Sequence, residues 1–359
     1  MVESFEKSDA EQSEISEPGG LKLKEEREHG FWRKHWERFK EKAIEILGKG
    51  KELPPISIEI FYAPHSSAED LQGFSESFER SDIFIPELSG WRVVDLEYYR
   101  KIADGDVVPQ EYFKTFSATP QIKEFLTHLL NRVASSKKPI TFIDLPAGHE
   151  LLRKPRGYET HKSFSETLHR VSEHLKGQAL FQKEREEYML KMLRPRIAEL
   201  LREYPELKKK KELCVLLFLG YLHTTVYYEL QKGGVDVKRS FGFSPLVFGR
   251  EEEAVRRIRF GKEVDNEFCA RVLAEDLFFS FTPLCHITEI SGELISRYMR
   301  RELKNLSFGD IKEIHDALAS AGLSGVSGRV CRAFVEKGVH IPTKEDIIAF
   351  KNHAEKKPS

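Results

Sequence analysis

The sequence is poor in cysteine and offers no paired thiols. Its 359 residues include only four cysteines, and these are widely spaced and form no Cys-x-x-Cys pair. This pattern argues against a disulfide scaffold and against a thiolate zinc site. We therefore interpret the four as buried thiols of a reducing compartment: Cys214, Cys269, Cys285 and Cys331.

The chain also lacks a long uncharged run and an excess of either charge. Its most apolar stretch, residues 268–287, still contains Arg271, Glu275 and Asp276, whereas a transmembrane helix needs about 20 mostly uncharged residues. Lys and Arg total 57 against 58 Asp and Glu, so no overall basic field favours nucleic acid. Residues 1–17 are acidic and contain no apolar core of a signal peptide. We expect a cytoplasmic protein with no nucleic-acid partner.

The N-terminal 50 residues divide into two segments. Residues 1–30 have few aliphatic side chains, which predicts a disordered tail. Residues 31–50 alternate aromatic and basic residues at helical spacing, which predicts a basic amphipathic helix with Trp32 and Trp36 on its apolar face. We favour packing of this face on the main domain. The alternative is contact with a membrane surface or a partner protein through residues Phe31–Phe39.

The main body, residues 54–240, alternates strand and helix patterns. Residues 56–62 and 82–88 are predicted strands around a helix at 69–80, and such a βαβ unit has parallel strands. Residues 139–145 are a predicted third strand, and the continuous apolar run at 212–220 is typical of a strand buried on both faces. Helices are expected at 124–134, at 160–204 with an interruption at Gly177, and at 225–231. We predict an α/β fold with a central parallel or mixed sheet flanked by helices.

The C-terminal third reads differently. Residues 241–345 show mainly helical patterns, and we expect them to complete the core or to pack on it. Residues 346–359 are expected to form a polar tail. The run of lysines at 208–211 is interpreted as a solvated loop, because one such run does not make a nucleic-acid site.

Ionisable or ligating side chains follow each of the predicted strands. His65 follows the first, Glu87 ends the second, Asp144 ends the third and His223 follows the fourth. Ligands of open α/β sheets bind at the carboxyl ends of the strands. Two imidazoles and two carboxylates at such positions suit a divalent metal or general acid–base chemistry.

The long central helix adds a further candidate set. Glu184 and Arg185 precede an apolar-periodic run, and Glu184, Glu187 and Tyr188 are three and four residues apart, on one side of a helix. Such a helix could direct a carboxylate and a guanidinium into the cleft at the strand ends.

These segments, in this order, resemble the TraB/PrgY family and its Tiki, GumN, EreA-like and ChaN-like relatives. The pieces that carry the resemblance are YAPHSS at 62–67, DIFIPEL at 82–88, IDLP at 143–146, EREEYMLKML at 184–193 and VLLFLGYLH at 215–223. Together they cover about residues 56–235. The chain departs from the family pattern at Tyr62, where the family has Gly, at Leu145, where it has Arg, and at Val226-Tyr227, where it has Gly-Ile.

The resemblance implies a metal-dependent hydrolase-like centre. His65, Glu87 and His223 would hold a divalent ion such as Mn, Co or Zn. Glu87 would also activate water, Glu184 would be a second carboxylate, and Arg185 would stabilise an oxyanion or hold Glu87. A metal with an open coordination position lowers the pKa of bound water to about 7.

Each candidate also has a purely structural interpretation. Glu87 and Arg185 could form a buried ion pair without catalysis, Glu184 could lie at a solvated start of a helix, and Asp144 could cap a turn. His149 lies beyond the strand end, and the pair His286 and Glu289 is better explained by core packing than by a metal.

The sequence thus supports two hypotheses. The leading one is a metal-dependent hydrolase that acts on an ester or peptide bond of a small-molecule or peptide substrate. The alternative is a catalytically degenerate ligand-binding or regulatory module on the same fold, which the departures at Tyr62, Leu145 and Val226 favour.

Overall fold

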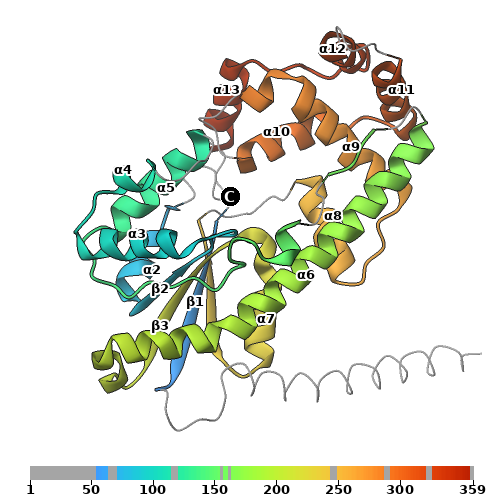
Figure 1. The fold of residues 1–359 in the computed structure, drawn as a ribbon. Helices are drawn as coiled ribbons and strands as arrows, with labels where there is room; N and C mark the ends of the chain where they lie inside the picture. The colour runs from blue at the N-terminus through green and yellow to red at the C-terminus, as the bar shows by residue number, and fades with distance from the viewer. Residues whose placement is uncertain are drawn as a thin grey trace, which may run out of the picture.

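A computed structural model of the chain describes residues 54–63, 71–114, 120–153, 157–160, 163–242, 249–286, 292–320 and 326–355. The predicted amphipathic helix at 31–50 and His65 lie outside these residues, as does Glu289. The chain forms a parallel sheet flanked by helices, with a helical C-terminal part on one side (Figure 1).

The described strands form one parallel sheet in the order β2-β3-β1-β4. They are β1 (Ile56–Ala63), β2 (Ile83–Pro86), β3 (Leu213–Gly220) and β4 (Asp236–Phe241). The central strand β3 pairs with β1 from Ile56↔Leu213 to Ala63↔Gly220, and with β2 on its other side. All the strands therefore end at the same edge, where side chains from distant parts of the sequence meet.

In β1, β2 and β3, alternate residues are buried on the two faces of the sheet. In β3, Leu216 and Phe218 face one core, while Val215, Leu217 and Leu219 face the other. This alternation follows from the period of two in a β-strand. Because both faces are buried, the strand reads in the sequence as one continuous apolar run.

The first face is covered by helices from the N-terminal half of the chain, and the second by α6 and α7. The helices of the first face are α2 (Phe74–Arg80), α3 (Val93–Asp104), α4 (Pro109–Tyr112) and α5 (Pro120–Val133). On the second face lie α7 (Thr224–Lys232) and the C-terminal half of α6 (Phe164–Glu203).

Helix α6 connects the sheet with the helical part. Its 40 residues make it about 60 Å long at 1.5 Å per residue. Residues 189–201 pack on the sheet, whereas residues 164–179 belong to the core of the helical part. Figure 1 shows this light-green helix running from the orange and red helices to the sheet. Arg185 and Glu186 lie between its two packing segments.

The helical part shares one core with the first half of α6. Its elements are α8 (Arg250–Arg259), α9 (Asn266–Phe281), α10 (Gly292–Leu303), α11 (Phe308–Ala319), α12 (Val326–Glu336) and α13 (Lys344–Glu355). Short 3₁₀ helices complete the described structure: η2 (Glu150–Arg153), η3 (Pro205–Lys209), η4 (Tyr221–His223) and η5 (Pro283–His286).

Several elements differ from the sequence-based expectation. Residues 139–145 are extended but form no ladder. They contact β2 through the bridge Phe84↔Ile140, and a second bridge joins Trp91 to Pro146. Helix α6 passes through Gly177 without interruption, because its packing on either side outweighs the low helix propensity of one glycine.

Further elements were not expected, namely α3, α4, β4 and the C-terminal helix α13. Strand β4 is mostly exposed, so it lacks the apolar alternation that reveals a strand in sequence. The expected polar tail at 346–359 is helical up to Glu355, as part of α13. Ile347 of this helix is buried in the helical core, which explains its order.

Candidate functional site

Glu87 lies directly after β2, at the edge where the strands end. Its backbone N–H donates to the carbonyl of Phe218 at 2.8 Å and so extends the pairing with β3. Its carboxylate Oε1 accepts a hydrogen bond from Arg185 Nη2 at 2.6 Å, and Oε2 accepts one from the backbone N–H of Gly220. The side chain is thus fixed from the neighbouring strand and from α6.

Gly220 is required by the closeness of this carboxylate. A Cβ atom at this position would lie 3.1 Å from Glu87 Oε2, which is tighter than an ordinary contact. The backbone of Gly220 is in the usual extended region, so conformational freedom is not the reason for glycine here. The absence of a side chain at Gly220, three residues before His223, therefore leaves room for Glu87 to accept its backbone N–H.

Arg185 joins Glu87 to Asp144. Its Nε donates to Asp144 Oδ1 at 2.9 Å, and its Nη2 contacts both Asp144 Oδ2 and Glu87 Oε1. Asp144 Oδ1 also accepts the backbone N–H of Leu145 at 2.7 Å. Burial disfavours the charge of Arg185, but the two carboxylates outweigh it and raise the pKa of the guanidinium.

His223 lies between two carboxylates and is almost fully buried. Its Nε2 is 3.2 Å from Glu87 Oε1, and its Nδ1 is 3.3 Å from Glu186 Oε1, an ion-pair distance without the alignment of a hydrogen bond. Its backbone carbonyl accepts from the hydroxyl of Tyr62 at 3.1 Å. Burial alone would lower the pKa of His223, but Glu87 and Glu186 raise it to about 9.

Glu186 and Arg259 are the site residues that the sequence interpretation missed. Glu186 lies on α6. It is buried, and its carboxylate also pairs with Arg259 Nη2 of α8 at 2.5 Å. The pairing with His223 and Arg259 lowers its pKa despite the cost of burial. The sequence contains a pattern that points to Glu186. Residues three and four positions apart share one face of a helix, and on the buried face of α6 these steps lead back from Leu193 to Met189 and then to Arg185 and Glu186.

Glu184, the carboxylate of α6 that was expected at the site, is half-buried beside the buried face of the helix. The carboxylate that faces His223 is that of Glu186. Tyr188 lies on another side of the helix, where its ring contacts His149 at a centroid distance of 5.0 Å. His149 Nδ1 accepts the backbone N–H of Leu151 at 3.3 Å, which is a structural role in a turn.

Four expected residues therefore converge, namely Glu87, Asp144, Arg185 and His223. With Glu186 and Arg259 they form a strand-edge network of three carboxylates and two guanidinium groups around one imidazole. A protonated His223 balances these charges, so this buried network is neutral. Such compensation is what a low-polarity interior demands of buried charges.

Of the three side chains expected to bind a divalent metal, the described residues include two, Glu87 and His223. Within that part of the chain, no group of three or more His, Cys, Asp or Glu side chains is arranged to hold a metal ion. Glu87 and His223 supply two donors, and the third expected ligand, His65, lies outside the described residues. His65 comes two residues after Ala63, which pairs with Gly220.

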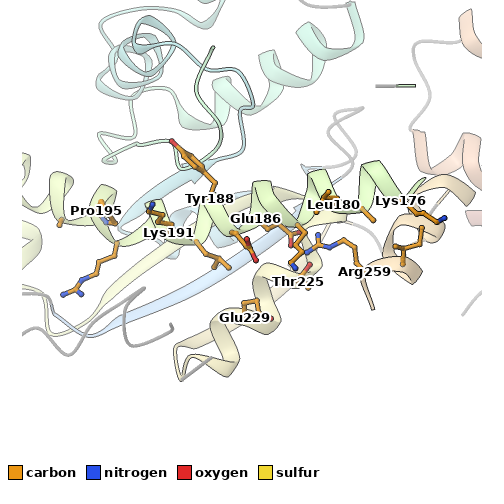
Figure 2. Close-up of a pocket in the computed structure, with 16 residues that line it drawn as sticks. Lys176, Leu180, Glu186, Tyr188, Lys191, Pro195, Thr225, Glu229 and Arg259 are labelled. Atoms are coloured by element: carbon orange, nitrogen blue, oxygen red, sulfur yellow. The ribbon is translucent and has the colours of Figure 1, made fainter. Parts of the chain in front are cut away.

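A groove of about 1110 Å³ runs along α6 next to this network. Its α6 wall extends from Lys176 to Ala198, and its other wall comes from Thr225 and Glu229 of α7 and from the end of α8. Figure 2 shows Glu186, Thr225 and Arg259 meeting near the middle of the groove. Apolar side chains line much of it: Ala179, Leu180, Leu190, Pro195, Ala198 and Ile258.

Arg259 connects the groove with the network. Its Nη2 donates to Glu186, whereas its Nη1 has no hydrogen-bond partner among the described residues. The side chain is only 9% exposed. A buried donor without a partner costs about 1–3 kcal/mol, and an acceptor that reached this nitrogen would remove that cost.

Among the described helices, none is both long enough and apolar enough to cross a membrane. In comparisons with known proteins, no family model, no curated protein and no solved structure matches the chain.

Proposed function

We propose that this protein is a metal-dependent hydrolase of the TraB/Tiki-like type, with its centre at the strand edge and an ester or peptide bond as its target. One observation carries the proposal: Glu87 Oε1 and His223 Nε2 are 3.2 Å apart, and the other ring nitrogen of His223 faces Glu186. Two ligand atoms on one tetrahedral zinc ion are separated by about 3.4 Å at bond lengths near 2.1 Å.

The surroundings of His223 fit a metal ligand. A ligating histidine usually directs its second nitrogen at a carboxylate, which fixes the ring and its tautomer, and Glu186 occupies that position. His65, close in sequence to the end of β1, is the proposed third ligand. When bound there, a divalent ion acts as a Lewis acid toward a carbonyl and lowers the pKa of water to about 7.

The residues of the chain itself hold this arrangement in place. Arg185 and the N–H of Gly220 fix the two oxygens of Glu87, and Asp144 in turn fixes Arg185. Arg259 holds Glu186 from α8, so that the helical part contributes to the orientation of His223. In this proposal Glu87 and His223 are ligands, and Arg185, Glu186 and Arg259 are positioning residues.

A second candidate function, a ligand-binding or regulatory module without chemistry, is favoured by a different observation. Glu87 already accepts hydrogen bonds from Arg185 and Gly220 and contacts His223. The raised pKa of His223 places a proton on the nitrogen that a metal would need. In this case the strand-edge network is a neutral, self-sufficient structural unit.

Metal binding by the full-length protein separates the two candidates. We expect equilibrium dialysis against Mn²⁺, Co²⁺ or Zn²⁺ to give one tightly bound ion per chain, and chelation to abolish hydrolysis in a panel of chromogenic esters and fluorogenic peptides. His65→Ala and Glu87→Gln should each lose the ion. Glu186→Gln should weaken binding by roughly 10–100-fold, as is usual for the carboxylate partner of a ligating histidine.

His149→Ala is the matched control, because this imidazole lies near the same edge but outside the network. It should keep the metal and the activity. Full turnover after chelation, or equal metal content in wild type, His65→Ala and Glu87→Gln, would reject the hydrolase proposal. If all of these folded proteins bind no metal, the binding module is the better description.

A further inference from the structure

The groove along α6 combines an apolar surface with several lysine and arginine side chains. Leu180, in one wall, is 51% exposed, which is high for a large aliphatic side chain next to other apolar groups. Lys183, Lys191 and Arg194 lie along the same wall, and no ion pair of theirs is found among the described residues. Lys176, at one end of this wall, pairs with Glu173, and Arg196, which does not line the groove, pairs with Glu199.

Arg259 supplies a second, independent indication of a ligand. Its guanidinium is nine-tenths buried at the groove wall, and Nη1 has no hydrogen-bond partner in the described part of the chain. Guanidinium groups are suited to bind carboxylate or phosphate oxygens, and a buried one binds them more strongly than one in water. Three carboxylates line the groove: Glu186, which Arg259 binds, Glu187, and Glu229, which pairs with Lys232.

The dimensions agree with a small amphipathic ligand. The α6 wall from Lys176 to Ala198 is about 33 Å long at 1.5 Å per residue. Leu180 and Arg259 lie at about the same level along α6, and Lys191 and Pro195 lie farther along the helix, beyond Glu186 (Figure 2). A charged head at Arg259 would therefore have the apolar side chain of Leu180 close to it and further apolar side chains, those of Leu190 and Pro195, along the groove.

We propose that this groove binds a single-chain amphipathic anion, with its carboxylate or phosphate head at Arg259 and its apolar chain over Leu180 and the neighbouring small side chains. Lys183 adds positive charge one turn from Glu186, on the groove side of α6. The site is separate from Glu87 and His223, because Glu186 lies between them and the groove. The proposal therefore does not depend on hydrolysis or on a metal.

Calorimetric titration of the full-length protein with dodecyl phosphate tests the proposal. The ligand is kept below its micelle concentration, and a chelator is present so that metal binding cannot contribute. We expect saturable binding of one molecule, at least tenfold tighter than that of dodecanol or of inorganic phosphate. Decanoate should bind as well, because the shared requirement is an anionic head on an apolar chain.

Variants locate the site. Arg259→Met should weaken dodecyl phosphate at least tenfold, and Leu180→Gln and Lys183→Glu should each weaken it several-fold. The controls are Val335→Gln and Lys304→Glu, an exposed apolar and an exposed cationic residue of the helical part, and both should bind within twofold of wild type. Leu180 and Lys183 are surface positions, so their variants remain informative if Arg259→Met does not fold.

Three results would overturn the proposal. One is equal affinity for dodecanol and dodecyl phosphate, and another is unchanged binding in folded Leu180→Gln and Lys183→Glu. The third comes from vesicles of phosphatidylcholine with or without phosphatidic acid. If the protein sediments with the acidic vesicles but binds no monomeric dodecyl phosphate, the ligand is a membrane surface and not a molecule in the groove.

Discussion

The protein buries charge in two places, and the two clusters are built differently. In the strand-edge network, Arg185, Arg259 and His223 meet Glu87, Asp144 and Glu186 through direct side-chain contacts. In the helical part, Glu275 accepts the backbone N–H of Arg250 at 2.8 Å, while the nearest guanidinium nitrogen of Arg250 is 3.5 Å away. Arg300, which also faces Glu275, is engaged by Glu253.

The consequence is visible in the protonation of the carboxylates. Glu186 has a lowered pKa although it is buried, whereas burial raises the pKa of Glu275 to about 7. Burial of charge by itself therefore does not mark a functional centre. What distinguishes the strand-edge network is that several potential ligands converge where parallel strands end, beside a groove.

The largest difference should come from removing one arginine of each cluster. Arg185→Met leaves Glu87 and Asp144 buried without their guanidinium partner, and we expect a loss of about 3–5 kcal/mol in the free energy of unfolding. Arg250→Met removes only a distant, partly exposed partner of Glu275, and the loss should be about 1 kcal/mol. Urea unfolding at pH 7 measures both, and losses of equal size would contradict the comparison.

The second difference concerns pH. The folded-state pKa of Glu275, about 7, lies above its ordinary value of 4.5, so between these values the folded state binds more protons than the unfolded state. The stability contributed by Glu275 is therefore complete below about pH 4.5 and is lost as the pH rises through 7, a change on the order of 3 kcal/mol. Glu275→Gln should remove this part of the pH profile, as measured by urea unfolding from pH 4.5 to 8.

Glu253→Gln is the control for this titration, because Glu253 belongs to the same cluster but has a lowered pKa owing to Arg300 and Arg257. The free energy of unfolding of this variant should still fall as the pH rises from 4.5 to 7. An unchanged fall in Glu275→Gln would show that another group is responsible.

The smallest expected effect comes from adding one methyl group at each of two glycines, one in the strand-edge network and one in α6. Gly220→Ala brings a Cβ to 3.1 Å from Glu87 Oε2, so we expect a loss of about 1 kcal/mol. Gly177→Ala meets no atom within 4 Å in the middle of α6, and should stabilise the protein by about 0.5–1 kcal/mol. Thermal unfolding of the two variants should give shifts of opposite sign. A neutral Gly220→Ala would mean that Glu87 can move away freely.

Much of the site followed from sequence because its residues occupy the ends of recognisable strands. The apolar runs at 56–62 and 212–220 locate β1 and β3, and the residues after such strands share one edge of a parallel sheet. This geometry brings Glu87 and His223 together from positions 136 residues apart. Asp144 was also found, although residues 139–145 form an extended segment without a ladder.

Other features could not be read from local patterns. On α6, Arg185 was expected at the site, but Glu184 was chosen as its carboxylate, whereas the structure places Glu186 beside His223. Arg259 lies in a separate helix, and no local rule connects it with Glu186. The position of β3 between β1 and β2 likewise depends on pairing between distant segments.

The sequence by itself determined the alternation of strands and helices and the chemistry available at the strand ends, because hydrophobic periodicity and turn residues act over a few neighbouring positions. Tertiary structure alone decided which charges meet and where the groove lies. Both depend on one long helix, α6, that packs on the sheet with one half and on the helical part with the other. Only that packing brings Glu186 between His223 and Arg259. The charges that meet there come from three separate elements, and because they are buried they must compensate one another.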